Sequence, residues 1–216
     1  MTGRTTTDRT ITVISAGLGQ PSATRMLADR LAAATVAELA AQGRSTTVET
    51  FELRNVAHEI INAMLTGFPS GDLRAVLESV SDADGLIAVT PLFTTTYSGL
   101  FKSFVDILDQ DSLARLPVLL GATGGTPRHS LALEYSMRPL FTYLHADVAR
   151  TSVFAATDDW SGHSDDLDPL SARITRGAHD LADLVAPGQR PRTADPYATA
   201  PSFGDLARGT GAAAPR

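Results

Sequence analysis

Cysteine is absent from the sequence, and lysine occurs only once, as Lys102. Without a thiol, the chain can form no disulfide, no thiolate metal site and no cysteine nucleophile. Acidic residues outnumber basic ones by 24 to 18, so the net charge of −6 offers no basic footprint for nucleic acid. No apolar run approaches membrane-spanning length, and the first ten residues are polar, unlike a signal peptide. We therefore expect a cytoplasmic protein with neither a nucleic-acid nor a membrane partner.

The rest of the composition is that of an ordinary globular protein. Hydrophobic residues make up 43% of the chain and charged residues 19%, and 216 residues suffice for one domain with a sizeable core. The final 30 residues differ, because they contain five Pro, four Gly and seven Ala and cannot form a packed face. We expect a flexible N-terminus over residues 1–9, one domain over 10–186 and a flexible tail over 187–216.

Short apolar or β-branched segments alternate with helical patterns along the domain. The segments predict strands over residues 10–16, 46–53, 86–89, 116–122 and 148–155. Helices are expected over residues 22–41, 56–65, 72–80, 98–108, 130–144 and 170–185. This alternation predicts a doubly wound parallel sheet of five strands in the order 2-1-3-4-5, with a ligand at the switch point between strands 1 and 3.

The loop after the first strand, SAGLGQPSATR, has the features of an anion site. Gly17 and Gly19 permit close backbone approach, while Ser22 and Thr24 place hydroxyls near the positive end of the following helix. The loop lacks the lysine of a P-loop and the GxGxxG spacing of dinucleotide folds. A phosphate fits this loop, although Ser22 could equally be a plain helix N-cap.

Two further loops should emerge at the same edge of the sheet. The first runs from Leu92 to Tyr97 and combines three threonines with two aromatic residues; the second, TGGTPR, exposes backbone at Gly124 and Gly125. Paired glycines are usually only a turn. Their coincidence with the first loop at one sheet edge favours a ligand site.

A proline inside the fifth expected helix should disturb it. Pro139 removes one backbone hydrogen bond and crowds the preceding turn, so we expect a kink or a π-bulge over residues 135–138. No pair of histidines has metal-ligand spacing, and we expect no metal site.

The segment PLFTTTYSGLFKSFVD, which runs from Pro91 to Asp106, resembles the P-x-Y-x…G-x-L-K…D signature of the NADPH-dependent FMN reductase family. Residues 122–141 are similar to the corresponding segment of flavin reductases that supply two-component monooxygenases, both alkanesulfonate-type and luciferase-like. The resemblance extends over about residues 10–156 and implies the flavodoxin-like fold. It also implies an inserted tyrosine at Tyr135 in a π-helix, which would govern flavin release or oligomerisation.

The resemblance assigns cofactor-binding roles to all three loops. Ser22, Thr24 and the backbone from Leu18 to Gln20 would hold the FMN phosphate; Pro91, Leu92, Phe93 and Thr94 would line the isoalloxazine; Thr123, Gly124 and Gly125 would lie against its pyrimidine end. Two departures stand out. Residues 18–20 replace the serine and arginine of the family's GSxR, for which Arg25 could compensate, and Phe93 replaces a tyrosine.

The function implied is hydride transfer from NADPH or NADH to FMN, with reduced flavin passing to a flavin-dependent monooxygenase. No catalytic acid or base is expected, because the cofactor supplies the reactivity and the protein supplies position and electrostatics. Family members are commonly homodimers or homotetramers, so the resemblance implies an oligomer. Two alternatives stay open, namely a reductase of the same fold for quinones, azo dyes or metal oxyanions, and a flavin-binding electron carrier without enzymatic activity.

Overall fold

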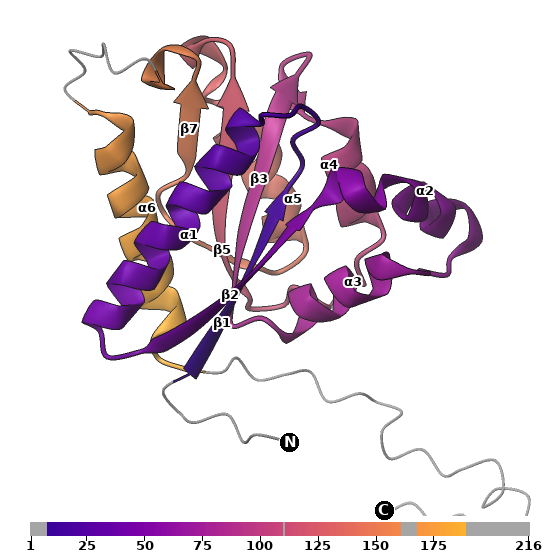
Figure 1. Ribbon diagram of the computed structural model, residues 1–216, viewed down its shortest axis with the longest axis horizontal. Helices are drawn as coiled ribbons and strands as arrows, with labels where there is room; N and C mark the ends of the chain where they lie inside the picture. Colours follow the sequence, from indigo (N-terminus) through magenta and orange to yellow (C-terminus); the bar gives the residue numbers. More distant parts are fainter. Residues whose placement is uncertain (1–7, 110, 161–167, 189–216) are drawn as a thin grey trace, which may run out of the picture.

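A twisted sheet forms the centre of the molecule, with helices on both of its faces (Figure 1). The computed structural model describes residues 8–109, 111–160 and 168–188. The strands are β1 (Asp8–Ser15), β2 (Ser45–Glu52), β3 (Gly85–Phe93), β4 (Thr96–Tyr97), β5 (Pro117–Gly124), β6 (Asp147–Val148) and β7 (Val153–Ala156). The helices are α1 (Ala23–Ala41), η1 (Leu53–Val56), α2 (Ala57–Thr66), α3 (Asp72–Asp82), α4 (Gly99–Asp106), η2 (Pro127–His129), η3 (Leu133–Met137), α5 (Arg138–Tyr143), η4 (Asp158–Trp160) and α6 (Leu170–Val185).

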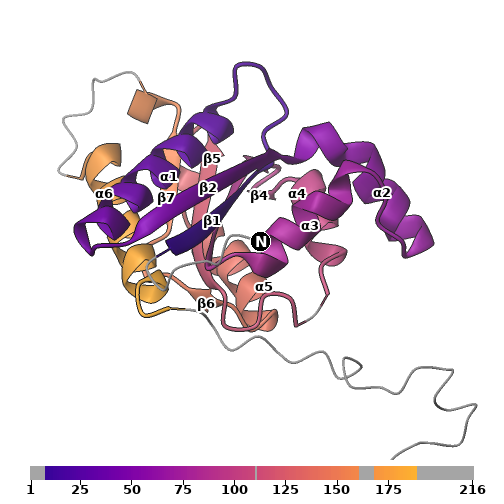
Figure 2. The same cartoon turned by 60° about the horizontal axis from the view of Figure 1, so that its bottom comes forward.

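Two apolar clusters explain why the central strands are hydrophobic on both faces. Ile87 and Val89 of β3 pack with α1 and α6, whereas Leu86 and Ala88 pack with the elements of the opposite face. Figure 2 shows α1 and α6 together on one side of the sheet and α2, α3 and α4 on the other. The continuous apolar run of β3 is therefore a consequence of coverage by two helical layers.

The doubly wound parallel sheet is confirmed, but its predicted strand count and simple order are wrong. The described residues form seven strands with the path β2-β1-β3-β5-β6, while β4 pairs with β3 and β7 pairs with β5. β4 arises because the chain after β3 turns back at once as a hairpin, in which Phe93 pairs with Thr96. The predicted switch point between β1 and β3 is present, since both strands pair in parallel in the middle of this path.

The expected fifth strand is broken into β6 and β7, which pair with different parts of β5. Between them, side chains occupy the backbone groups that a continuous ladder would use. Arg138 donates to the carbonyls of Ala149 and Arg150 at 3.0 Å each, and the N–H of Thr151 donates to Asp180 at 2.9 Å. These side chains replace strand partners for three backbone groups at the point where the chain leaves the sheet.

The first and last described elements are β1 and α6. β1 begins at Asp8, two residues earlier than expected, and the buried Arg9 donates from Nε to the carbonyl of Val185 at 3.1 Å. This bond ties the start of β1 to the end of α6. Of the segments expected to be flexible, 1–9 and 187–216, residues 1–7 and 189–216 lie outside the described residues. None of the helices that the structure describes combines the length and apolarity needed to span a bilayer.

The predicted disturbance of the helix around Pro139 is confirmed as a π-helix. It spans Leu133–Met137, and the N–H of Arg138 donates to the carbonyl of Leu133, five residues earlier. Pro139 has no N–H with which to complete the preceding turn as an ordinary α-helix. Tyr135 lies within this π-helix and is 78% exposed, so it is not part of the core.

Candidate functional site

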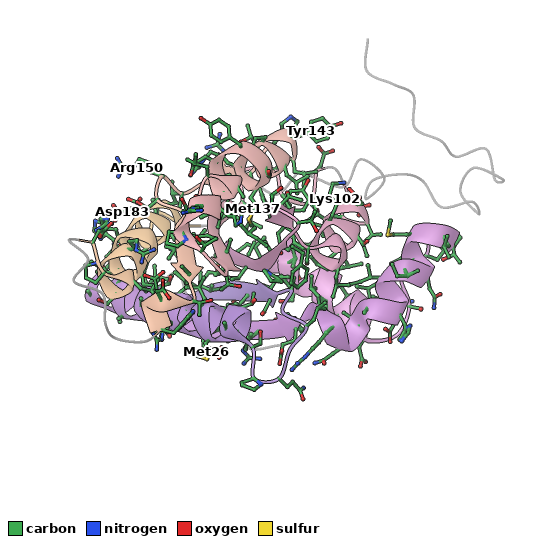
Figure 3. All side chains as sticks on the ribbon, turned by 90° about the horizontal axis from the view of Figure 1, so that it is seen from above. Met26, Lys102, Met137, Tyr143, Arg150 and Asp183 are labelled. Carbon is green, nitrogen blue, oxygen red and sulfur yellow. The ribbon has the colours of Figure 1, made fainter. Side chains whose placement is uncertain are left out.

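Three loops meet at the carboxyl edge of the sheet, at the top of Figure 1. We call residues 16–22 the first loop, residues 92–97 the β3–β4 hairpin and residues 123–126 the glycine loop. Neighbouring strands bring them together, because Ser15 pairs with Val89 and Pro91 pairs with Thr123. Figure 3 is seen from above, and its labelled Met26 on α1 and Lys102 on α4 lie on opposite sides of the sheet.

A buried hydrogen bond joins the first loop region to the glycine loop. The hydroxyls of Thr24 and Thr123 lie 2.9 Å apart, and both side chains are buried. Pro91 lies beside Thr123 in the sheet, while Leu92 reaches within 4.0 Å of the position of a Cβ on Gly124. The structure therefore brings residues from all three predicted loops into contact, although they are far apart in the sequence.

The first loop carries an unusual run of free backbone donors. Within the part of the chain that the structure describes, no protein acceptor is found for the N–H groups of Gly17, Leu18, Gly19, Gln20, Ser22, Ala23 and Thr24. The last two belong to the first turn of α1, where the helix dipole adds positive potential. Free amides at a helix N-terminus form the usual site for a phosphate or another anion.

Ser22 serves as the helix cap and stays available to a ligand. Its Oγ accepts from the N–H of Arg25 at 3.2 Å, which confirms the N-cap interpretation. The hydroxyl proton is not used in this bond and can be donated to an anion. A Cβ at Gly17 would lie 2.1 Å from Ser22 Oγ. Any other residue at position 17 would therefore force the capping hydroxyl to move.

Arg25 does not extend freely into the first loop as the sequence suggested. Its Nε lies 2.8 Å from Asp29 Oδ1 and its Nη1 lies 3.2 Å from Glu52 Oε1. The hydrogen bond to Asp29, opposed in part by burial, raises the pKa of Arg25. Its charge is therefore already compensated by two carboxylates. The structure instead places Arg54, which sequence reasoning missed, against the loop, where Nη1 donates to the carbonyl of Gly19 at 2.8 Å.

The segment expected as an open loop after β3 is a tight two-residue hairpin. Its two central residues, Thr94 and Thr95, have φ values of 51° and 73°. Both values belong to the left-handed region, which Asn and Gly normally occupy in such turns and which strains β-branched residues. Phe93 is 47% exposed at the base of this turn. The hairpin thus presents strained backbone and an aromatic ring at the edge where ligands bind.

Hydrogen bonds at the base of the hairpin hold it in place. The buried Thr90 accepts from the N–H of Ser98 at 3.1 Å, and Ser98 in turn caps α4 by accepting from the N–H of Phe101 at 3.2 Å. Tyr97 packs against Phe101 with ring centroids 6.0 Å apart. The strained tip is therefore attached to a rigid base, as a preorganised loop requires.

The glycine loop leaves β5 beside the hairpin. A Cβ on Gly124 would lie 2.9 Å from the Phe154 ring, whereas a Cβ on Gly125 would meet nothing within 4 Å. Gly124 is therefore needed for packing against β7, and Gly125 faces open space. Thr126 then caps the short η2 by accepting from the N–H of Arg128 at 3.4 Å. The space beside the Cα of Gly125, where a side chain would begin, is open.

The donors at this edge are backbone amides and hydroxyls. In the described ranges, no group of three or more His, Asp or Glu residues could hold a metal ion. A separate pocket between α2 and α4, bordered by Met64, Pro69 and Ile107, includes none of the predicted site residues. Lys102 and Asp106 form an ion pair along α4. The edge can therefore bind a phosphate and a flat polar ring, which fits FMN.

Comparisons with known proteins identify the family. The model of the NADPH-dependent FMN reductase family matches residues 9–161. An FMN reductase (NADPH) from Pseudomonas aeruginosa is 34% identical over 176 residues, which are 81% of this chain and 91% of that protein. The NADH-dependent FMN reductase SfnF from Pseudomonas fluorescens is 31% identical over 181 residues, 84% of this chain and 94% of that protein.

A solved structure shows the same fold. The X-ray structure of an oxidoreductase from Corynebacterium diphtheriae superposes with a TM-score of 0.81 and 41% identity, covering 85% of this chain and 100% of that one. The fold is flavodoxin-like, as the resemblance in the sequence implied. Because the family model covers more than half of the sequence and the relatives match over most of their length, the chain belongs to the NADPH-dependent FMN reductase family.

Proposed function

We propose that the three loops form the FMN site of an NAD(P)H-dependent FMN reductase. The first loop and Ser22 would hold the phosphate, the hairpin residues Pro91–Thr94 would line the isoalloxazine, and the glycine loop would contact its pyrimidine end. The observation that carries this proposal is the run of free amides from Gly17 to Thr24 beside the N-terminus of α1. Such a run binds an anion without needing a basic side chain.

When bound, FMN would supply the redox chemistry by accepting a hydride from the nicotinamide ring of NADPH or NADH. The chain's own contribution is position and electrostatics. The amides at Gly124 and Gly125 would face the flavin edge where negative charge develops, and backbone donors stabilise such charge at no reorganisation cost. The exposed Phe93 and the hairpin tip border a surface that is open to a second planar ring.

We further propose that the reduced flavin passes to a flavin-dependent monooxygenase in the cytoplasm and that the enzyme is a homodimer or homotetramer. The partner is supported by the similarity of residues 122–141 to reductases of two-component monooxygenases. Tyr135 and Tyr143 support oligomerisation, because both are more than two-thirds exposed on the consecutive helices η3 and α5. Large exposed aromatic side chains are enriched at protein interfaces.

Aerobic oxidation of NADH and NADPH, with and without added FMN, tests this function. We expect FMN-dependent oxidation of at least one nicotinamide cofactor. A protein that binds FMN but oxidises neither would be an electron carrier, and the enzyme proposal would be wrong. A quinone that replaces FMN as the better acceptor at fixed nicotinamide concentration would identify the alternative reductase of the same fold.

A further inference from the structure

Arg54 contacts two residues of the first loop, Gly19 and Gln20. It lies in η1, directly after the carboxyl end of β2, and its Nη1 donates to the carbonyl of Gly19 at 2.8 Å. With its amide oriented to satisfy both groups, the side-chain oxygen of Gln20 accepts from Arg54 Nη2 at 2.8 Å. One guanidinium therefore contacts both residues of the Gly19–Gln20 peptide.

Glu52 holds this guanidinium in position. Its Oε2 lies 2.8 Å from Arg54 Nη2, while its Oε1 lies 3.2 Å from Arg25 Nη1. Only 15% of the Glu52 side chain and 19% of the Arg54 side chain are exposed, so solvent screens this pair less than a surface pair. The carboxylate thus links β2, η1 and α1 around the first loop.

The direction of a peptide carbonyl fixes the direction of the neighbouring N–H. In a planar trans peptide the two bonds point in opposite directions. Since the carbonyl of Gly19 points to Arg54, the N–H of Gln20 points away from it, and this N–H has no acceptor among the described residues. The guanidinium therefore keeps one of the free donors of the loop turned away from β2.

We propose that Glu52 and Arg54 are positioning residues that set the Gly19–Gln20 peptide so that its N–H binds the phosphate of the flavin. The inference rests on the proposed function and deepens it. In this chain, the serine and arginine side chains that the family's first loop usually carries are replaced by an oriented backbone amide. We assign Arg54 to the peptide and not to the phosphate because its Nη atoms contact Gly19, Gln20 and Glu52, whereas its unpaired Nε is buried.

Comparison of FMN with riboflavin isolates the phosphate, because riboflavin has the same ring and no phosphate. The dissociation constants of both ligands are measured by fluorescence titration for the wild type and for Arg54→Met, which keeps much of the side-chain length. We expect FMN to bind about tenfold more weakly to the variant, because one hydrogen bond from a backbone N–H to the charged phosphate is lost. Riboflavin should bind within about twofold of the wild type. The matched control is Arg74→Met on the exposed face of α3, which should change neither constant.

Glu52→Gln separates positioning from direct charge recognition. If Arg54 positions the peptide, the variant releases the guanidinium and the preference for FMN over riboflavin falls. If Arg54 were itself a phosphate ligand, loss of the competing carboxylate would strengthen FMN binding. A preserved or increased preference in Glu52→Gln, or equal weakening of FMN and riboflavin in Arg54→Met, overturns the inference.

Failure of the proposed function would be seen in the wild type alone, as a protein that binds neither flavin. If the wild type binds both flavins equally, flavin binding stands and the inference is overturned. Thermal midpoints show which variants are folded.

If Arg54→Met does not fold, Arg54→Lys replaces it, because lysine keeps the charge but cannot contact both residues in a planar fork. For Arg54→Lys we expect the ratio of FMN affinity to riboflavin affinity to lie between the wild-type ratio and one. A ratio equal to that of the wild type would contradict the inference.

Discussion

The first loop and the break between β6 and β7 both interrupt regular structure, but they treat their backbone polar groups in opposite ways. In the first loop, the amides from Gly17 to Thr24 have no acceptor within the described residues. At the break, the carbonyls of Ala149 and Arg150 and the N–H of Thr151 all bond to side chains. The difference suggests that the first loop is a binding region and that the break between β6 and β7 is part of the scaffold.

The contrast also extends to strain. The hairpin beside the first loop keeps two threonines at positive φ, whereas no residue from Ala149 to Ser152 has a positive φ. Natural proteins usually avoid such conformations, and residues that adopt them cluster at functional sites. Free amides and backbone strain in the same region therefore favour a binding role for the carboxyl edge of the sheet.

The largest expected effect is on stability, from Arg138→Ala at the break. The variant loses hydrogen bonds to the carbonyls of Ala149 and Arg150 and to Ser152 Oγ, and leaves a buried carbonyl unpaired. We expect the free energy of unfolding to fall by about 3 kcal/mol in chemical denaturation. Arg150→Ala is the control, because its side chain is 87% exposed and should contribute less than about 0.5 kcal/mol. A tenfold loss of FMN affinity in folded Arg138→Ala would show that the break is not merely scaffold.

Gly125→Val tests the ligand edge with little cost to the fold. Because nothing lies within 4 Å of a Cβ at this position, we expect the free energy of unfolding to change by less than about 0.5 kcal/mol. The added side chain would meet a bound flavin, so FMN affinity should fall at least about tenfold. Isothermal titration and denaturation of the same preparation measure both quantities. Normal FMN binding and turnover in this variant would count strongly against the proposed placement of the isoalloxazine.

Strain in the hairpin predicts a substitution that makes the protein more stable. Thr95→Gly removes a β-branched residue from φ 73°, and we expect a gain of about 1 kcal/mol after allowing for the greater entropy of glycine in the unfolded chain. The comparison is Thr142→Gly at an exposed position of α5, where glycine should cost about 0.3 kcal/mol relative to threonine. If calorimetry shows both variants equally destabilised, the left-handed turn stores no strain.

The smallest effect is expected from His179, on the surface between α1 and α6. The hydrogen bond to Glu38, with the nearby charge of Asp183, raises the pKa of His179 above 6.5. The protonated form is therefore the stabilising one. Its contribution is fully present below pH 6.5 and disappears as the pH rises through the raised value.

We accordingly expect the thermal midpoint of the wild type to exceed that of His179→Gln at pH 5.5 and to match it at pH 9. Glu38→Gln should reduce the same difference, because it removes the principal cause of the shift. A midpoint difference that grows with pH would have the wrong sign for a stabilising imidazolium.

Local patterns in the sequence were sufficient for several features of the fold and the site. Ser22 was expected as a possible N-cap, and its side chain caps α1 in the structure. Pro139 predicted a kink or a π-bulge, and a π-helix is found, because the loss of one N–H is a property of the residue itself. The three loops could be assigned to one edge because every strand of a parallel sheet ends there.

Features that depend on residues distant in sequence could not be predicted in this way. The break after β6 depends on Arg138 and on Asp180, which lies 29 residues after Thr151. The support of the first loop depends on Arg54, 35 residues after Gly19. The hairpin was missed because two threonines are poor residues for a tight turn, and tertiary contacts at its base override that local preference.

The sequence by itself determined the alternation of strands and helices, the switch point and the types of residue at the carboxyl edge, because periodicity and capping act over a few residues. Tertiary structure alone decided which of these residues are free to bind. Arg25 is held by Asp29 and Glu52, Arg54 holds the first loop, and Gly125 faces open space while Gly124 is packed. The physical reason is that a polar group can bind a ligand only if no residue that the fold places beside it already forms a hydrogen bond or ion pair with it.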